Sequence, residues 1–82
     1  MGAIAHDHIV SDPAIMGGKP TIRGTRITVE LILEELAEGM TLADVLAAHP
    51  HLDESDVRAA LGFAADYLRR EEIIFGTPAS AA

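Results

Sequence analysis

The sequence contains three segments in which apolar residues recur at helical spacing, and each follows a residue that caps helices. In the first segment, Thr28 offers its hydroxyl to the free N–H groups of the opening turn, and Gly39 provides the stop. The apolar stripe between them consists of Val29, Ile32, Leu33, Leu36 and Met40. Because these residues share one helical face, the segment predicts an amphipathic helix beginning after Thr28.

The second segment carries the same signature in a shorter form. Asp44 follows Thr41 at the spacing of a capping box. A residue that precedes a proline is pushed out of the helical region, so the helix must end before Pro50. The sequence therefore predicts a short helix over residues 42–48. Its predicted buried residues are Leu42, Val45 and Leu46.

The third segment predicts a longer helix over residues 54–70, opened by Asp53 with Asp56 three residues later. Its predicted buried stripe is Val57, Ala60, Leu61, Ala64 and Leu68. A short and a longer helix joined by a brief turn must cross steeply to share one core. The predicted fold class is therefore all-α, a three-helix bundle with a helix-turn-helix. Bundles without a DNA-binding role show the same pattern, so DNA binding stays open.

The arm before the first helix is predicted to be extended, because two prolines exclude a helix interior. Two β-prone runs, residues 21–22 and 25–27, flank Arg23-Gly24, where glycine can adopt the positive φ of a tight turn. The sequence thus predicts a short N-terminal β-hairpin at this turn. A lone hairpin is barely stable in water, so it must pack on the helices or on a second subunit.

Length and composition bound the architecture. With 82 residues and no cysteine, the chain forms one small core without disulfides, and we expect a homodimer to supply further stability. We predict a flexible N-terminus (1–7), a single domain with its β arm (8–70) and a C-terminal tail (71–82). No apolar run could span a membrane and no secretory signal is visible, so we expect a cytoplasmic location.

The formal net charge of −7 weighs against nucleic-acid binding, because an acidic chain repels phosphates. DNA contacts must then come from a local basic patch or from a partner. Lys19, Arg23 and Arg26 form such a patch within the arm. We expect Lys19 and Arg23 to be free for contacts, and favour for Arg26 an ion pair with a carboxylate of the first helix.

The start of the predicted third helix is poorly suited to reading DNA. Residues 53–56 read Asp-Glu-Ser-Asp, which suits the positive end of a helix but repels phosphates. Only Arg58 lies where a side chain could meet a base edge. The candidate nucleic-acid-binding residues are therefore Lys19, Arg23, Arg26 and Arg58, and we expect weak specific binding by the isolated chain.

Several stretches together resemble the signature of domain-of-unknown-function family 433, over residues 9–68. They are Asp12-Pro13, Gly18 through Val29, Gly39-Met40-Thr41, His49-Pro50-His51-Leu52 and Val57-Arg58-Ala59-Ala60-Leu61. The resemblance implies a homeodomain-like trihelical fold behind a β arm and no catalytic residues. It also implies similarity to VapB-type antitoxins, which are often encoded beside a PIN-like ribonuclease toxin.

Two faces and the tail are candidates for partner binding. A smooth strip is predicted to lie opposite the apolar stripe of the third helix and suits a subunit or partner interface; it consists of Ser55, Ala59, Gly62, Asp66 and Arg69. A neutral surface glycine explains Gly62 equally well. Leu31 lies on the outward face of the first helix and could dock on a basic ribonuclease surface, although such faces are commonly only solvated; the acids around it are Glu34, Glu35 and Glu38. By the resemblance, Arg69 and Arg70 are candidates for blocking the toxin.

The expected function is that of an antitoxin that neutralises a PIN-like toxin and, as a dimer or complex, binds operator DNA. The alternative is a protein–protein adaptor with a vestigial helix-turn-helix and no DNA role. We expect no enzyme activity and no cofactor, because no nucleophile–base motif or phosphate-binding loop is present. The His-x-His pairs His6/His8 and His49/His51 lack further ligands, so we expect no metal site.

Overall fold

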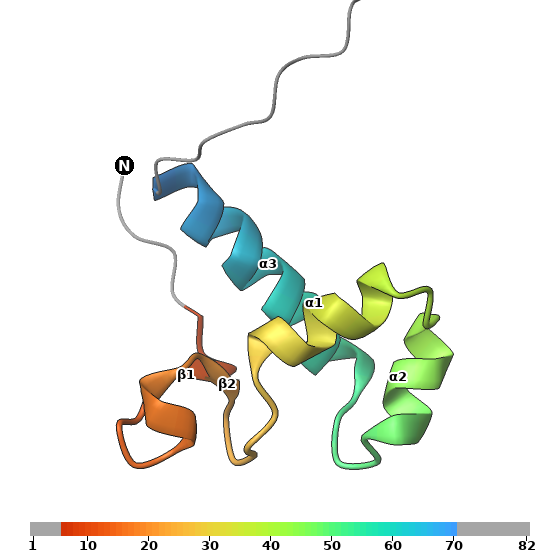
Figure 1. The fold of residues 1–82 in the computed structure, drawn as a ribbon, viewed down its shortest axis with the longest axis horizontal. Coiled ribbons are helices and arrows are strands. Elements are labelled where there is room, and N and C mark those ends of the chain that lie inside the picture. The colour runs from red at the N-terminus through yellow and green to blue at the C-terminus, as the bar shows by residue number, and fades with distance from the viewer. Residues whose placement is uncertain (1–5, 71–82) are drawn as a thin grey trace, which may run out of the picture.

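The computed structural model describes residues 6–70, in which three helices follow a small arm (Figure 1). The arm contains strand β1 (Ile9–Val10), a 3-10 turn η1 (Met16–Gly18) and strand β2 (Thr21–Ile22). The helices are α1 (Val29–Ala37), α2 (Leu42–Ala48) and α3 (Glu54–Arg70). Figure 1 shows α1 crossing α3, with α2 on the opposite side from the strands. The predicted three helices are confirmed.

The helix ends form as the capping residues predict. The Thr28 hydroxyl accepts a hydrogen bond from the backbone N–H of Leu31 at 3.0 Å. Thr41 and Asp44 make both bonds of a capping box at the start of α2. Gly39, at φ +105°, follows α1 in a conformation that other residues rarely adopt. Local chemistry therefore sets the limits of these helices.

The predicted hairpin is confirmed at its turn, across which Thr21 and Thr28 form an isolated antiparallel bridge, but its second segment forms no strand. β2 pairs antiparallel with β1, in the register Ile9 to Ile22 and Val10 to Thr21. Residues 25–27 form no strand, although the Ile22 N–H donates to the Ile27 carbonyl at 2.9 Å and Gly24 has φ +79°. β1 supplies the buried Ile9, whereas residues 25–27 lead directly into α1. Packing on the helices therefore decides that β1 is the strand that pairs with β2.

Both strands and all three helices contribute to a single core. Its fully buried members are Ile9, Ile22, Val29, Ile32, Val45, Leu52, Val57 and Ala60. The stripes predicted for α1 and α2 lie in or against this cluster. On α3 the prediction is partly wrong, because Leu61 and Leu68 are 44% and 55% exposed while Phe63 packs on the core.

The predicted outward face of α3 is wrong at Asp66, which is only 9% exposed, whereas Ser55, Gly62 and Arg69 are exposed as expected. Its carboxylate lies 2.8 Å from His6 Nε2 and also pairs with Arg69. These cationic and hydrogen-bonding partners compensate for burying a carboxylate, which sequence patterning assigns to solvent. Contacts with the domain therefore begin at His6, inside the segment expected to be a flexible N-terminus.

Two further histidines also bind carboxylates on other elements. His8 Nδ1 lies 3.1 Å from Asp56 on α3, and His49 Nε2 lies 2.9 Å from Glu35 on α1. Within residues 6–70, no three or more His, Asp or Glu side chains are arranged so that they could hold a metal ion together. No helix within the same residues combines the length and the apolar character needed to cross a membrane.

Candidate binding surfaces

The turn after β2 lies beside the first turn of α3. The Arg23 backbone N–H donates to the His8 carbonyl at 2.7 Å, and the His8 ring contacts Asp56. Arg23 Nε donates to the Asp7 carbonyl at 2.7 Å, so its exposed guanidinium is oriented by the arm. The fold therefore brings Arg23 close to the helix on which Arg58 lies.

Carboxylates surround Arg58 at the start of α3. Arg58 Nε donates to Glu54 at 2.8 Å, across one helical turn. Asp53 and Asp56 cap each other's backbone N–H groups. The Ser55 hydroxyl, followed by the Asp56 N–H, lowers the pKa of Asp53. Because Asp53 thus holds its negative charge, this end of α3 repels phosphates.

The other two basic candidates differ from expectation. Lys19 Nζ pairs with Glu30 at 3.2 Å, at the opposite end of the arm from Arg23, rather than being free. Both side chains are more than half exposed, so the pair contributes little to stability. Arg26 is exposed and has no ion pair within residues 6–70, so its predicted pairing with α1 is wrong. The four basic candidates do not form one patch.

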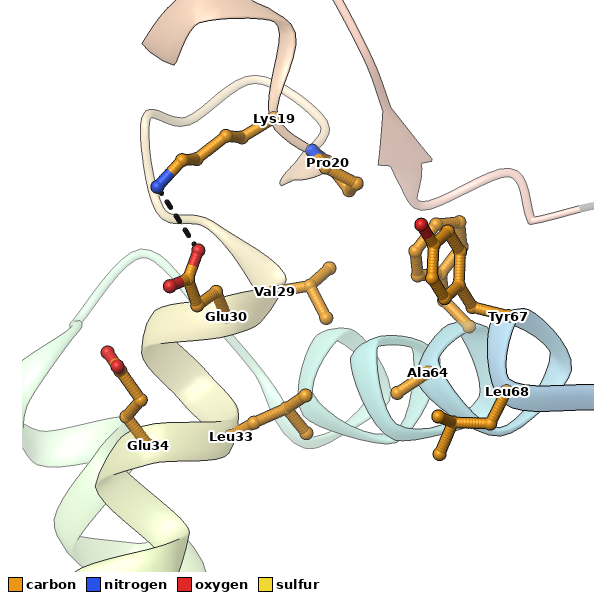
Figure 2. A pocket seen from close by; sticks show the side chains of 10 residues that line it. Lys19, Pro20, Val29, Glu30, Leu33, Glu34, Ala64, Tyr67 and Leu68 are labelled. Atoms are coloured by element: carbon orange, nitrogen blue, oxygen red, sulfur yellow. Dashed lines mark hydrogen bonds and ion pairs between the residues drawn. The ribbon is translucent and has the colours of Figure 1, made fainter. Parts of the chain in front are cut away.

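An apolar groove of about 370 Å³ lies between the arm, α1 and α3 (Figure 2). Val29 and Leu33 of α1 face Ala64, Tyr67 and Leu68 of α3 across it, and Pro20 closes the end near the arm. Phe63 and Tyr67 stack at 6.1 Å between ring centroids. Sequence reasoning missed this groove, although two aromatic residues four positions apart on a helix already indicate a shared surface.

The outward side of α1 carries an acidic face, which we define as Glu30, Leu31, Glu34 and Glu38. All four residues are exposed, and Leu31 is the single large apolar side chain among them, at 37% exposure. Glu35 does not belong to this face, because His49 holds its carboxylate at 2.9 Å. The acidic face thus combines three carboxylates with one apolar anchor.

The remaining partner-binding candidates do not assemble into one surface. Ala59 is half-buried against the core, whereas Gly62 is exposed and has no atom within 4 Å of the position that a Cβ would take. Arg69 pairs with the buried Asp66. The side chain of Arg70 and the tail 71–82 lie outside the described residues.

Comparison with known proteins places the chain in a family. The family model described as "Protein of unknown function (DUF433)" matches residues 9–64. Uncharacterized protein y4eO of Sinorhizobium fredii (strain NBRC 101917 / NGR234) is 37% identical over 75 residues, covering 90% of this chain and 34% of that protein. This chain therefore spans about a third of the length of that relative.

A solved structure shares the fold. The crystal structure of a DUF433 member protein from Anabaena variabilis ATCC 29413 matches with a TM-score of 0.72 at 28% identity. The match covers 77% of this chain and 62% of that one, so this chain again spans only part of its relative. Sequence and structure agree with the predicted resemblance: the chain belongs to the DUF433 family of proteins of unknown function.

Proposed function

We propose that this chain is a non-catalytic recognition module, the antitoxin of a type II toxin–antitoxin pair, which neutralises a PIN-like ribonuclease. The observation that carries the proposal is the acidic face of α1. A ribonuclease must present a cationic surface to the phosphates of its substrate. An acidic face with an apolar anchor is complementary to such a surface and occludes it when bound.

The composition of the acidic face suits this role. Glu30 is 60% exposed, and Glu34 and Glu38 also point to solvent, so their charges can steer association with a basic partner. Leu31 lies at the centre of the acidic face and supplies an apolar contact that the carboxylates around it cannot make. Apolar side chains buried at the centre of protein interfaces have the same role. The carboxylates thus set the rate and specificity of binding, while Leu31 contributes to its lifetime.

In this proposal α2 and α3 form a homeodomain-like helix-turn-helix that contacts operator DNA mainly within the toxin complex. Arg58 lies within α3, and the Arg23 backbone bonds to His8, whose ring contacts Asp56 at the start of α3. Glu54 holds Arg58, and Asp53 is charged beside it, so the free dimer binds DNA weakly. A basic partner that covers the acidic face lowers the net negative charge and strengthens DNA binding.

The second candidate function is an adaptor that binds proteins and has no DNA role. The Arg58–Glu54 ion pair favours the adaptor, because Glu54 already neutralises the arginine that is best placed to contact DNA. Gel shifts of the chain, alone and with the ribonuclease, at two salt concentrations separate the candidates. Phosphate contacts require binding that weakens steeply as salt rises. The absence of any salt-dependent shift, with or without the ribonuclease, favours the adaptor.

The antitoxin role is tested with a purified PIN-like ribonuclease from the genome that encodes this chain. We expect the chain to inhibit RNA cleavage, and Glu34→Lys to weaken the inhibition at least about tenfold, since it puts like charges together. Asp7→Lys makes the same charge change at an exposed residue of the arm and should leave inhibition unchanged. Equal effects of the two variants, or no inhibition by the unaltered chain, would contradict the proposal.

A further inference from the structure

α3 carries a second apolar face that the described fold leaves uncovered. We call it the seam and define it as Leu61, Ala64, Ala65 and Leu68. Leu61 is 44% exposed, Leu68 is 55% exposed, Ala65 is exposed and Ala64 is half-buried. The spacing of three, four and seven residues places all four on one side of the helix. This spacing is typical of helix–helix packing rather than of isolated exposed residues.

The seam is symmetric about its own midpoint. Leu61 lies three residues before Ala64, and Leu68 lies three residues after Ala65. If a second α3 runs antiparallel against the first, with a two-fold axis between the alanines, Leu61 of each copy meets Leu68 of the other. Ala64 of each copy then meets Ala65 of the other. The seam is therefore complementary to itself, as an isologous interface requires.

The side-chain sizes along the seam also fit a helix pair. Small residues at the centre allow two helices to approach to about 8 Å between axes. The larger leucines then close the two ends of the contact. The seam adjoins the apolar groove, since Ala64 and Leu68 line both, and Tyr67 beside them is 52% exposed (Figure 2). A second copy would thus cover the seam and one edge of the groove.

We propose that two copies of this chain pair through antiparallel α3 helices, with the two-fold axis between Ala64 and Ala65. We assign the seam to a second copy of the chain because the order of its side chains, leucine, alanine, alanine and leucine, is the same when the helix is reversed. An unrelated partner has no reason to show this symmetry. The proposal deepens the proposed function, in which the antitoxin is a dimer, by assigning the interface. It leaves the acidic face on α1 free for the ribonuclease.

The first test measures oligomeric state by sedimentation equilibrium of the full chain. We expect a dimer, with Leu61→Glu and Leu68→Glu each raising the dissociation constant at least about 100-fold, because a lost apolar contact counts twice in a symmetric interface. Leu31→Glu, at an exposed leucine of α1, should leave it unchanged. A monomeric chain overturns the proposal, as does a dimer that neither seam variant weakens.

The second test fixes the register through single cysteines, since the chain contains none. In this register the two copies of Ala65 are offset by only one residue along the axis, about 1.5 Å, so Ala65→Cys should form an intermolecular disulfide in a glutathione buffer. Leu61 and its counterpart are seven residues apart along the axis, about 10 Å, beyond the roughly 7 Å between Cα atoms that a disulfide spans. Leu61→Cys alone should not cross-link, and the Leu61→Cys/Leu68→Cys double variant should.

The pattern of cross-links discriminates among occupants. Cross-linking of Leu61→Cys alone indicates parallel helices and overturns the proposed geometry. If the wild-type chain is monomeric and dimerises once residues 71–82 are removed, that segment rather than a second copy covers the seam. Both tests use the chain alone, so their failure is distinguishable from a failure to inhibit the ribonuclease.

Discussion

Substituting Gly62 by alanine should stabilise the protein. Gly62 lies in the middle of α3, where glycine costs about 1 kcal/mol relative to alanine. An added Cβ would meet no atom within 4 Å, and the backbone φ is not positive, so nothing offsets the gain. A gain of about 1 kcal/mol raises the melting temperature of a domain of this size by roughly 4–8 °C.

Gly24→Ala is the matched control for this prediction. A Cβ at Gly24 also meets nothing within 4 Å, but the backbone there has φ +79°. An L-residue in that conformation costs about 1–2 kcal/mol, so this substitution should destabilise the protein. The two variants share the same chemical change and the same open space, and differ in backbone conformation. The predicted difference between them is therefore about 2–3 kcal/mol.

Urea unfolding at one fixed protein concentration measures both free energies of unfolding, since oligomerisation makes apparent stability depend on concentration. An unchanged or lower stability of Gly62→Ala would refute the reasoning, because it would show that the glycine faces a close contact in solution. Weakening of the dimer by the same variant would extend the interface beyond the seam to the adjoining face that carries Gly62.

Three further predictions follow from the core and the charged groups. Ile32→Ala should cost about 2–5 kcal/mol in urea unfolding, because Ile32 is fully buried; a cost below 1 kcal/mol would contradict the core assignment. A hydrogen bond from the Thr41 backbone N–H lowers the pKa of Asp44 below its usual 3.8. Hydrogen bonding, chiefly from the Ser55 hydroxyl, does the same for the pKa of Asp53. Both groups therefore stabilise the fold above pH 3.8, and this stabilisation is lost as the pH falls through the lower folded pKa. Asp44→Asn should make thermal stability less dependent on pH in that acidic range, and an unaltered dependence would contradict the capping assignment. Asp66→Asn should speed amide hydrogen exchange near His6 more than in the core, because it removes a charged partner 2.8 Å from the ring; unchanged exchange would show that this pair does not tether the arm.

Sequence patterns predicted the structure correctly where it depends on residues that are close together along the chain. The caps at Thr28 and Thr41 and the stop at Gly39 involve atoms three or four residues apart, so local chemistry decides them. The turn at Gly24 is likewise a local matter of φ. Family membership was also readable, because the distinctive stretch before α1 is contiguous in sequence.

The partner of β2 and the orientation of α3 depend on contacts between distant residues. β2 pairs with β1 because Ile9 can be buried beneath the helices, and no feature near residues 21–22 announces that choice. Asp66 reads as a solvent-facing residue, yet His6, sixty positions away, makes its burial possible. With Asp66 turned inward, Leu61 and Leu68 turn outward and create the seam.

The candidate binding sites divide in the same way. The sequence alone determined which residues are basic, acidic or apolar, and it correctly placed Glu34 and Glu38 beside the exposed Leu31, but it also assigned Glu35 to that face. Only the tertiary structure decided which charges meet: Lys19 with Glu30 across the groove, and Glu35 with His49. The physical reason is that helical periodicity fixes a face, whereas the rotation of that face toward core or solvent follows from packing against elements remote in the chain.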